Sequence, residues 1–584
     1  MIDRQAFGEE TMTSRSKAWL AVGLVLVVLG LGLAAIVFGT LYATRHVPGN
    51  TVLAIDISGP IPEMTPDSPF GDIFGPRLVS RQDLRDGLVQ AASDARVQKV
   101  VVKVGDLEAG FATIQEIHTL LEKVRKAGKE TYAYLDTAGE FSPGNAQYYL
   151  ASACKKVVLN PLGDVNLTGL AIRSPFIRGT LDKLEIEPDF PGIGDYKTAR
   201  FFYTQKEFTP AHKEMMQWLL DSLTRQIGAG IAAGRGMDPK QVRLLMQGGP
   251  YLGPDALRVK LVDELNDWES FLEENTTRPD GKLERVSLRK YLRAGRPDQS
   301  GTEVAVVVAE GTILRGESGY SPMPLFGGDV MGSDTIAHAF QQVRDSGAKA
   351  VIFRINSPGG SAVASEIIRA EMVRTAKKMP VVVSMGDVAA SGGYWITCGA
   401  KRIVADPGTI TASIGVFGGH LAMARFWEDK LGITWGKLDG APNSAIFGSL
   451  DPWTPEQKAV VQKFLDRIYD RFLHNVSASR NMPREAVDAI GRGRVFTGEQ
   501  AKERGLVDAL GGFDAALAVA RELAGLKPDA RVELTFYPKA RSIWQRLLER
   551  NDDAEARMQA MVREVLAGRA VTPGPVWLAP IQVQ

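Results

Sequence analysis

The chain carries the same series of segments twice, displaced by roughly 250 residues. YYLASACKKVVLNP from Tyr148 matches YWITCGAKRIVADP from Tyr394, which places Pro161 opposite Pro407. Four further pairs of segments match in the same order, so the repeat covers almost everything between residues 51 and 525. A duplication of this extent predicts two similar domains in tandem, one for each copy.

Each copy alternates short β-branched runs with helical segments. VLAIDISGPI from Val52 and VAVVVAEGTI from Val304 are matching runs that are typical of buried strands. Strands that alternate with helices indicate crossover units around a parallel sheet. We therefore expect an α/β fold, with a first domain over residues 51–275 and a second over residues 301–530.

The stretches on either side of the second copy differ from both domains. Residues 276–300 place Pro, Gly and charged residues around a short helical piece, so we expect a linker there. Residues 531–584 begin with the strand-like RVELTFY and continue into an amphipathic helical stretch and a Pro-containing tail. We expect this C-terminal extension to have no counterpart in the first copy, and its sequence indicates no role.

A long apolar segment precedes both copies. Residues 18–43 carry no charged side chain for 26 residues, and a helix of this length spans the roughly 30 Å hydrocarbon core of a bilayer. A cleaved secretory signal is the alternative, but its apolar region is only about 7–15 residues long. Basic residues are more numerous before the segment than closely after it, Arg4, Arg15 and Lys17 against Arg45. This asymmetry predicts a cytoplasmic N-terminus over residues 1–17 and a body outside the cytoplasm.

The composition argues against several classes of function. Hydrophobic residues make up 45% of the chain, charged residues 23%, and the net charge is +1, which gives no reason to expect a nucleic-acid partner. The two cysteines, Cys154 and Cys398, are too few for a disulfide framework and lack metal-ligand spacing. Neither an HExxH motif nor a GxxxxGK[ST] phosphate loop occurs. We therefore expect no metal and no cofactor.

Two strand-to-helix transitions in the second copy carry the residues best suited to chemistry. The first, RINSPGGSAVASEIIRAEM from Arg354, contains Gly359 and Gly360 between a strand and a helix. Glycine lets backbone N–H groups approach a bound carbonyl, and the positive end of the helix dipole lies beside them. Both features are typical of an oxyanion hole.

The second transition, VVVSMGDVAASGGYWITCGA from Val381, places Ser391 at the start of a helix. Small neighbours leave its hydroxyl sterically open, and the N–H of Gly392 is another candidate oxyanion donor. A serine that only caps a helix is the simpler interpretation of an isolated SGG. The SPGGS motif in the same copy favours a nucleophile instead.

Together, NSPGGS, DVAASGGYW and TASIGVFG from Thr411 resemble the signal peptide peptidase A family of serine proteases, in its long, duplicated form. The resemblance extends over residues 18–530. It implies two tandem Clp protease/crotonase-like domains of repeated ββα units behind one transmembrane helix. It also implies an endopeptidase of a bacterial-type inner membrane, with a periplasmic body, that degrades remnant signal peptides. The expected assembly is a homo-oligomer, with a tetramer as its form.

The resemblance further implies a Ser/Lys dyad in place of a Ser-His-Asp triad. The family's lysine motif matches GIGDYKTA, so Lys197 in the first copy would be the general base and Ser391 in the second the nucleophile. Ser413, in TASIGV, resembles the serine that orients this amine. Because lysine titrates near pH 10.4, a base near neutrality requires that burial lower its pKa. The side chains expected to supply that burial are Ile193, Tyr196, Phe201 and Phe202.

The repeat register offers a check on this assignment, because two copies that share one active site should lose complementary groups. In the first copy, Asn145 and Leu167 take the places of the nucleophile and of the orienting serine, and GDLEAG replaces NSPGG. In the second copy, the position of Lys197 falls near Ser444, where there is no lysine. We therefore expect one site per pair of copies, closed either within one chain or between neighbouring chains.

Other interpretations stay open at this point. His420 lies near Ser413 along the chain and would be the candidate for a His-based triad. A scaffold of the same fold could bind membrane peptides without cutting them, and acyl-CoA chemistry occurs on the same superfamily fold. Two Pro- and Gly-containing loops, which include Phe70 and Phe326, are expected to face the membrane or a neighbouring subunit, and packing within the loops is the alternative.

Overall fold

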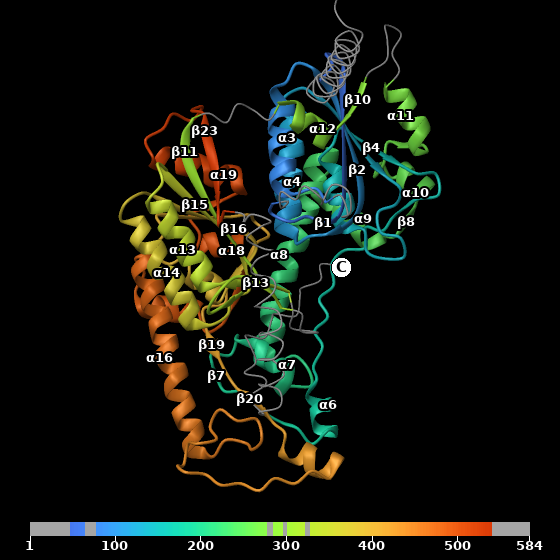
Figure 1. Cartoon of the computed structure of the whole chain (residues 1–584). Helices are drawn as coiled ribbons and strands as arrows, with labels where there is room; N and C mark the ends of the chain where they lie inside the picture. Colours follow the sequence, from blue (N-terminus) through green and yellow to red (C-terminus); the bar gives the residue numbers. More distant parts are fainter. Residues whose placement is uncertain (1–46, 65–77, 277–283, 296–300, 322–327, 540–584) are drawn as a thin grey trace, which may run out of the picture.

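The computed structural model describes residues 47–64, 78–276, 284–295, 301–321 and 328–539. These residues form two α/β units, each built on a mostly parallel sheet, and the N-terminal unit (blue to green) lies beside the C-terminal one (yellow to red) in Figure 1. The α/β fold expected for the two copies is confirmed.

Several expected features fall outside the described residues. They are the transmembrane helix over 18–43, the N-terminus over 1–17, most of the extension over 531–584, and the loop residues Phe70 and Phe326. Among the helices that the structure does describe, none is long and apolar enough to cross a membrane.

The first sheet is parallel throughout and is covered by helices on both faces. On one face, Leu53 and Ile55 pack against three helices, α3 (Arg81–Ser93), α4 (Phe111–Lys126) and α5 (Asn145–Ser152). On the other face, Val52 packs in a cluster with Phe271 of α11 (Trp268–Thr276). In spatial order the strands are β10 (Glu284–Ser287), β1 (Thr51–Pro60), β2 (Val97–Glu108), β3 (Glu130–Leu135), β4 (Lys156–Leu159) and β9 (Glu264–Leu265).

The second sheet follows the same order and is similarly covered. From one edge it runs through β23 (Val532–Tyr537), β11 (Thr302–Glu310), β15 (Ala350–Ser357) and β16 (Val381–Ala390). Beyond β16 it divides into two branches, β17 (Arg402–Ala405) with β22 (Ala509–Leu510), and β18 (Ile410–Ala412) with the antiparallel β21 (Val495–Thr497). The helices around it are α13 (Ser333–Arg344), α14 (Ala362–Ala376), α15 (Gly392–Trp395) and α19 (Phe513–Leu523), with a small sheet of β12 (Thr312–Leu314), β13 (Gly319–Ser321) and β14 (Gly328–Gly332).

The edge strands of the two sheets correct one expectation. β10 pairs in parallel with β1, and β23 pairs in the same way with β11. β10 and α12 (Leu288–Gly295) fall inside the expected linker, and β23 falls in the extension that was expected to have no counterpart. The two strands are counterparts that complete their sheets. A strand of four residues such as β10 is too short for its period-2 pattern to stand out.

Each copy also has one long helix, α8 (Pro210–Arg235) or α16 (Pro455–Arg480). As the Thr-Pro pairs predict, each begins after a threonine N-cap, because the hydroxyls of Thr209 and Thr454 accept backbone N–H groups of the first turn. The shorter elements that follow are α9 (Pro239–Gly248), β8 (Tyr251–Leu252) and α10 (Gly253–Arg258) in the first copy, and α17 (Arg484–Ile490) and α18 (Gly498–Glu503) in the second.

A segment of the first copy leaves its own sheet and pairs with the second copy. Its strands β6 (Glu187–Asp189) and β7 (Gly192–Ile193) pair antiparallel with β20 (His420–Ala422) and β19 (Val416–Phe417). These pairs lie below both sheets in Figure 1. The rest of the segment consists of α6 (Arg178–Lys183), the short 3₁₀ helix Thr198–Arg200 and α7 (Phe201–Thr204). The two copies are therefore interlocked, and Lys197 lies between β7 and the 3₁₀ helix.

Candidate active site

Ser391 lies at a sharp junction between strand and helix. It follows the last residue of β16, precedes α15, and has φ +54° and ψ −119°, a backbone conformation that non-glycine residues rarely adopt. The junction is held because the Ser391 N–H donates to the Ala412 carbonyl at 2.8 Å. Gly393 brings α15 close to β15, since a Cβ added there would lie 2.5 Å from the Ser357 carbonyl oxygen.

Lys197 reaches this serine from the other copy. Its Nζ lies 3.0 Å from Ser391 Oγ, 2.9 Å from Ser413 Oγ and 3.1 Å from the Ser413 carbonyl oxygen. The structure thus brings together within one chain the three side chains that the sequence singles out. The sequence left open whether Lys197 and Ser391 meet within one chain or between neighbouring chains. In this geometry they meet within one chain.

Burial controls the charge of Lys197. The residue is only 5% exposed, and this desolvation lowers the pKa of the amine to about 7. Asp195, its nearest acidic neighbour in sequence, instead lies 3.7 Å from Arg492. Among the described residues no carboxylate forms a hydrogen bond or ion pair with this amine, so burial dominates its pKa.

The residues that pack close to Lys197 include two glycines that no motif in the sequence singles out. A Cβ added at Gly493 would lie 2.4 Å from the backbone nitrogen of Lys197, and one added at Gly415 would lie 3.3 Å from Lys197 Cδ. The ring of Tyr196, expected to help bury the amine, lies under the guanidinium of Arg494 instead. The signal for Gly493 was present in the repeat, since Gly248 stands opposite it in the first copy.

Residues 492–494 join the lysine segment to the serine segment. The Arg492 carbonyl accepts the N–H of Tyr196 at 3.2 Å, and the Arg494 carbonyl accepts the N–H of Ser413 at 2.9 Å. Between them, the Gly493 N–H donates to the Ile414 carbonyl at 2.8 Å. This stretch therefore fixes the backbones on both sides of the lysine contact.

The three glycines expected to form an oxyanion hole differ in their hydrogen bonding. The N–H of Gly359 donates to Ser357 Oγ at 3.2 Å, so it is not available to a bound carbonyl. The N–H groups of Gly360 and Gly392 have no acceptor among the described residues. They lie close together, because a Cβ added at Gly392 would be 3.0 Å from the Gly360 nitrogen.

In the first copy, the position that matches Ser391 holds Asn145, whose side-chain amide is hydrogen-bonded to the backbone of Gly169. Asn145 Nδ2 donates to the Gly169 carbonyl at 2.8 Å, and the Gly169 N–H donates to Asn145 Oδ1 at 3.0 Å. Leu167, opposite Ser413, is fully buried. Ser444, opposite Lys197, lies in an exposed turn in which its Oγ accepts the Ala441 N–H. The surroundings of these three residues fit the expectation that the first copy has no nucleophile here and the second copy has no lysine base.

His420 does not take part in this constellation. It lies in β20 with its ring 4.3 Å from that of Trp453, centre to centre, and burial lowers the pKa of its imidazole. The side chain that contacts Ser391 Oγ is the lysine. The geometry therefore favours the lysine over the histidine as the partner of Ser391.

Comparison with known proteins places the chain among peptidases. A model of peptidase family S49 matches residues 123–279 and 374–527, one segment in each copy. Protease 4 of Salmonella typhi is 34% identical over 514 residues, 85% of this chain and 79% of that protein. The chloroplastic serine protease SPPA of Arabidopsis thaliana is 30% identical over 471 residues, 78% and 67% of the two chains. A putative signal peptide peptidase SppA of Enterococcus faecium is 36% identical over 174 residues, 30% and 50%.

Solved structures match less closely. ClpP1 of Listeria monocytogenes is 15% identical, and the match covers 36% of this chain and 94% of that chain with a TM-score of 0.24. The family model, in contrast, covers more than half of this chain, and the two long relatives are proteases by name. Together they support a serine protease, and the chain belongs to peptidase family S49.

Proposed function

We propose that the chain is a serine endopeptidase in which Ser391 is the nucleophile and Lys197 the general base. The observation that carries this proposal is the 3.0 Å contact between Lys197 Nζ and Ser391 Oγ, made by an amine whose pKa burial lowers to about 7. An amine with this pKa is mostly neutral just above neutral pH and can accept a proton.

The contacts of Lys197 favour one direction of proton transfer. A neutral amine has two hydrogens and one lone pair, and the Ser413 carbonyl oxygen and Oγ are placed to accept the two hydrogens. The lone pair then faces Ser391 Oγ. As Oγ attacks the peptide carbonyl, its proton passes to Nζ, and the ammonium returns that proton to the leaving amine. Water then releases the acyl-enzyme by the same route, with Lys197 again as base.

The negative oxygen that forms during attack needs hydrogen-bond donors. We assign this role to the N–H groups of Gly360 and Gly392, which lie beside Ser391 and have no acceptor within the described part of the chain. Backbone donors held in place before the reaction stabilise such an oxyanion without reorganisation. The lack of a side chain at Gly359 leaves room for Ser391, since a Cβ there would lie 2.8 Å from Ser391 Cβ.

We further propose that the substrates are remnant signal peptides and similar apolar peptides of a membrane. The enzyme would be anchored through residues 18–43 in a bacterial-type inner membrane, with a cytoplasmic N-terminus and a periplasmic body. The uncharged run of 26 residues and its basic N-terminal flank support the anchor, and the name of the Enterococcus relative supports the substrate. Protease added to spheroplasts of expressing cells should digest the body; full protection would contradict this orientation.

The proposed chemistry is tested with purified full-length protein, a fluorophosphonate probe and a quenched apolar peptide. Ser391→Ala should abolish labelling, and Lys197→Met should lower labelling and cleavage by at least about 1,000-fold, as loss of a base that activates a nucleophile does. Lys206→Met is the matched control, because Lys206 is exposed and pairs with Asp182. Cleavage by Lys197→Met at the wild-type rate would overturn the proposal.

We also propose that the enzyme is a homo-oligomer, with a tetramer as the form implied by the family resemblance. Through the repeat, residues 431–445 correspond to the segment that holds β6 and β7, yet they are exposed throughout. Residues 168–177 correspond to the segment that holds β19 and β20, yet they belong to no strand. Placing residues 431–445 of one chain on residues 168–177 of the next would repeat the pairing seen within the chain. Head-to-tail contacts of this kind close into rings when the rotation between neighbours closes.

The assembly is tested by light scattering coupled to gel filtration. Leu438 and Trp435 are 102% and 51% exposed on the 431–445 segment, so Leu438→Asp with Trp435→Ser should dissociate the oligomer. Leu162→Asp, at an equally exposed leucine outside both segments, is the control. An unchanged mass in the double variant would contradict this contact.

A further inference from the structure

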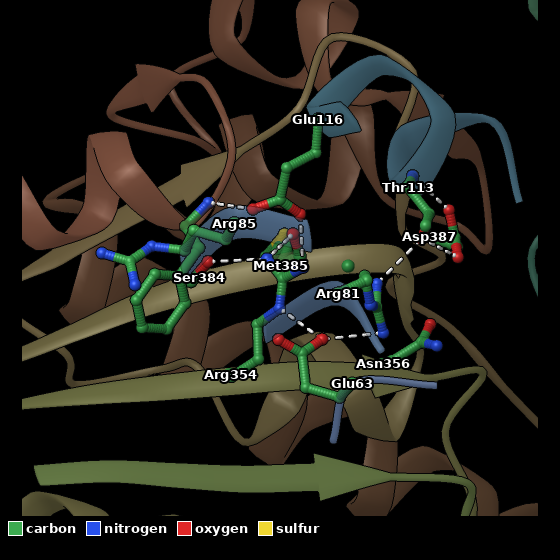
Figure 2. Close-up of polar contacts among 12 residues, drawn as sticks. Glu63, Arg81, Arg85, Thr113, Glu116, Arg354, Asn356, Ser384, Met385 and Asp387 are labelled. Atoms are coloured by element: carbon green, nitrogen blue, oxygen red, sulfur yellow. Dashed lines mark hydrogen bonds and ion pairs between the residues drawn. The ribbon is translucent and has the colours of Figure 1, made fainter. Parts of the chain in front are cut away.

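A carboxylate of the second copy caps a helix of the first copy near Ser391. Helix α4 begins after Gly110, which has no side chain with which to cap it. Asp387 takes that role, because its Oδ1 accepts the Thr113 N–H at 2.8 Å and its Oδ2 accepts the Thr113 hydroxyl at 2.6 Å. Figure 2 shows the Asp387 carboxylate facing Thr113. A carboxylate at a helix N-terminus satisfies unpaired N–H groups and is favoured by the helix dipole.

The helix of the second copy that matches α4 has a cap of its own. The matching helix, α14, begins after Ser361, whose own Oγ accepts the Ala364 N–H. At Gly110 a side chain has no room, since an added Cβ would lie 2.3 Å from Asp387 Cγ. The glycine and the distant carboxylate therefore act together in place of a local cap.

Asp387 lies in an irregular part of the strand that ends at the nucleophile. β16 pairs regularly with β15 up to Met385, and the pairing resumes at Ala389 after a shift in register. Within the shift, the Val388 N–H donates to Asn356 Oδ1 at 3.1 Å. A β-bulge bends its strand and re-aims side chains. Here it directs Asp387 to the first copy, four residues before Ser391.

The same arrangement occurs in the opposite direction. Glu116 of α4 accepts the N–H of Phe513, the first residue of α19, whose N-cap Gly512 has no side chain. The second Glu116 oxygen accepts from Arg354 at 2.6 Å, and Arg354 Nε donates to Glu63 at 3.0 Å. Figure 2 shows Arg354 between Glu63 and Glu116. The two copies thus exchange helix caps, and short charged hydrogen bonds fix their relative position.

We infer that Asp387 is a positioning residue for Ser391 and acts through Thr113. The inference rests on the proposed function, in which the second copy supplies the serine and the first copy the lysine. The 3.0 Å contact of that pair requires the two copies to stay in register. The Asp387–Thr113 contact ties the strand that carries the nucleophile directly to the other copy, so its loss lets Ser391 shift relative to Lys197.

The main test is Thr113→Val, which keeps the side-chain volume and removes the hydroxyl. On a quenched apolar peptide its kcat should fall about 10- to 100-fold, because a displacement of about 1 Å has effects of this size, while KM stays within about two-fold. The pH at half-maximal kcat/KM should rise, since an amine that loses its packing regains its charge more easily. Thr113→Ser keeps the hydroxyl and should restore the wild-type values.

A second variant and a control complete the test. Gly110→Ala presses a methyl group against Asp387 without removing any hydrogen-bonding group, and it should reproduce the fall in kcat. Lys123→Gln removes another contact between the copies at the exposed end of the same helix, to Asp514, and should leave kcat within about two-fold.

The outcomes separate this inference from the proposed function. Wild-type kcat and pH profile in folded Thr113→Val, together with an inactive Lys197→Met, would overturn the positioning role and leave the dyad intact. Wild-type activity of Lys197→Met would overturn the dyad itself. If Thr113→Val does not fold, Gly110→Ala becomes the deciding variant. A wild-type kcat in Gly110→Ala would then overturn the positioning role of Asp387.

Discussion

Lys197 Nζ lies 3.0 Å from Ser391 Oγ, although 194 positions separate the two residues in the chain. The lysine reaches the serine because β7 of the first copy pairs with β19 of the second. Neither copy contains both groups, so the contact exists only when the two copies are docked. Activity and the stability of the docked form should therefore respond together to changes at this junction.

The pH dependence of catalysis should follow the amine. Because burial lowers the pKa of Lys197 to about 7 and only the neutral amine accepts a proton, kcat/KM should rise with pH and reach half of its plateau near pH 7. The measurement is a profile of kcat/KM on a soluble apolar peptide from about pH 5 to about pH 9. A kcat/KM that still rises without a plateau at about pH 9 would mean that burial does not lower the pKa of this amine.

The same burial makes stability depend on pH. The pKa of Lys197 falls from 10.5 to about 7 on folding, so between these values the unfolded chain binds one more proton and the free energy of unfolding rises with pH. Burial of Lys197 lowers the free energy of unfolding most below pH 7. Lys197→Met has no buried amine, so from about pH 7 to about pH 9 the free energy of unfolding of the wild type should rise by roughly 2 kcal/mol more than that of the variant. Urea denaturation at both pH values measures the difference, and parallel changes would contradict it.

Ser413 should matter for rate more than for binding. Its Oγ accepts from Lys197 at 2.9 Å, whereas its carbonyl contact, at 3.1 Å, does not depend on the side chain. Ser413→Ala should therefore lower kcat about 10- to 100-fold, which corresponds to loss of one hydrogen bond to a charged or reacting group, and leave KM nearly unchanged. Ser444→Ala, at the exposed position opposite Lys197, serves as the control. Equal kcat in the two variants would show that the hydroxyl does not orient the amine.

Gly493 should be intolerant of a side chain because of what it touches. Gly493 and Gly505 both have positive φ, +88° and +71°, so alanine strains the backbone at both positions. Only at Gly493 would the new Cβ collide with a neighbour, the backbone of Lys197. Gly493→Ala should therefore reduce fluorophosphonate labelling at least about 10-fold, and Gly505→Ala should not. Similar labelling of both variants would mean that backbone strain, and not the lysine contact, is what matters.

Much of the architecture could be predicted because it depends on local patterns. The first residues of α8 and α16 follow from a threonine N-cap and a proline that lie next to each other in the sequence. The α/β alternation of both copies follows from strand-length runs between helical segments. Ser391, Lys197 and Ser413 were found through motifs, and the repeat register identified Asn145 and Leu167 as their unreactive counterparts.

Features that depend on contacts between distant segments were missed or only partly foreseen. β10 is recognisable as a strand only through its pairing with β1. The N–H of Gly359 looks like that of Gly360 in the sequence, and only the position of Ser357 Oγ shows that it is occupied. The cap that Asp387 supplies to α4 has no local signature, because Gly110 reads as an ordinary helix start with no side-chain cap.

The amino-acid sequence by itself determined the duplication, the fold class of each copy and the candidates for the reactive side chains. Each of these rests on neighbouring residues, on spacing along the chain or on motifs. Only the tertiary structure decided that the lysine and the serine meet within one chain, and how strongly the amine is desolvated. Burial and distance are properties of the docked copies, because Gly415 and Gly493 of the second copy lie against Lys197 of the first.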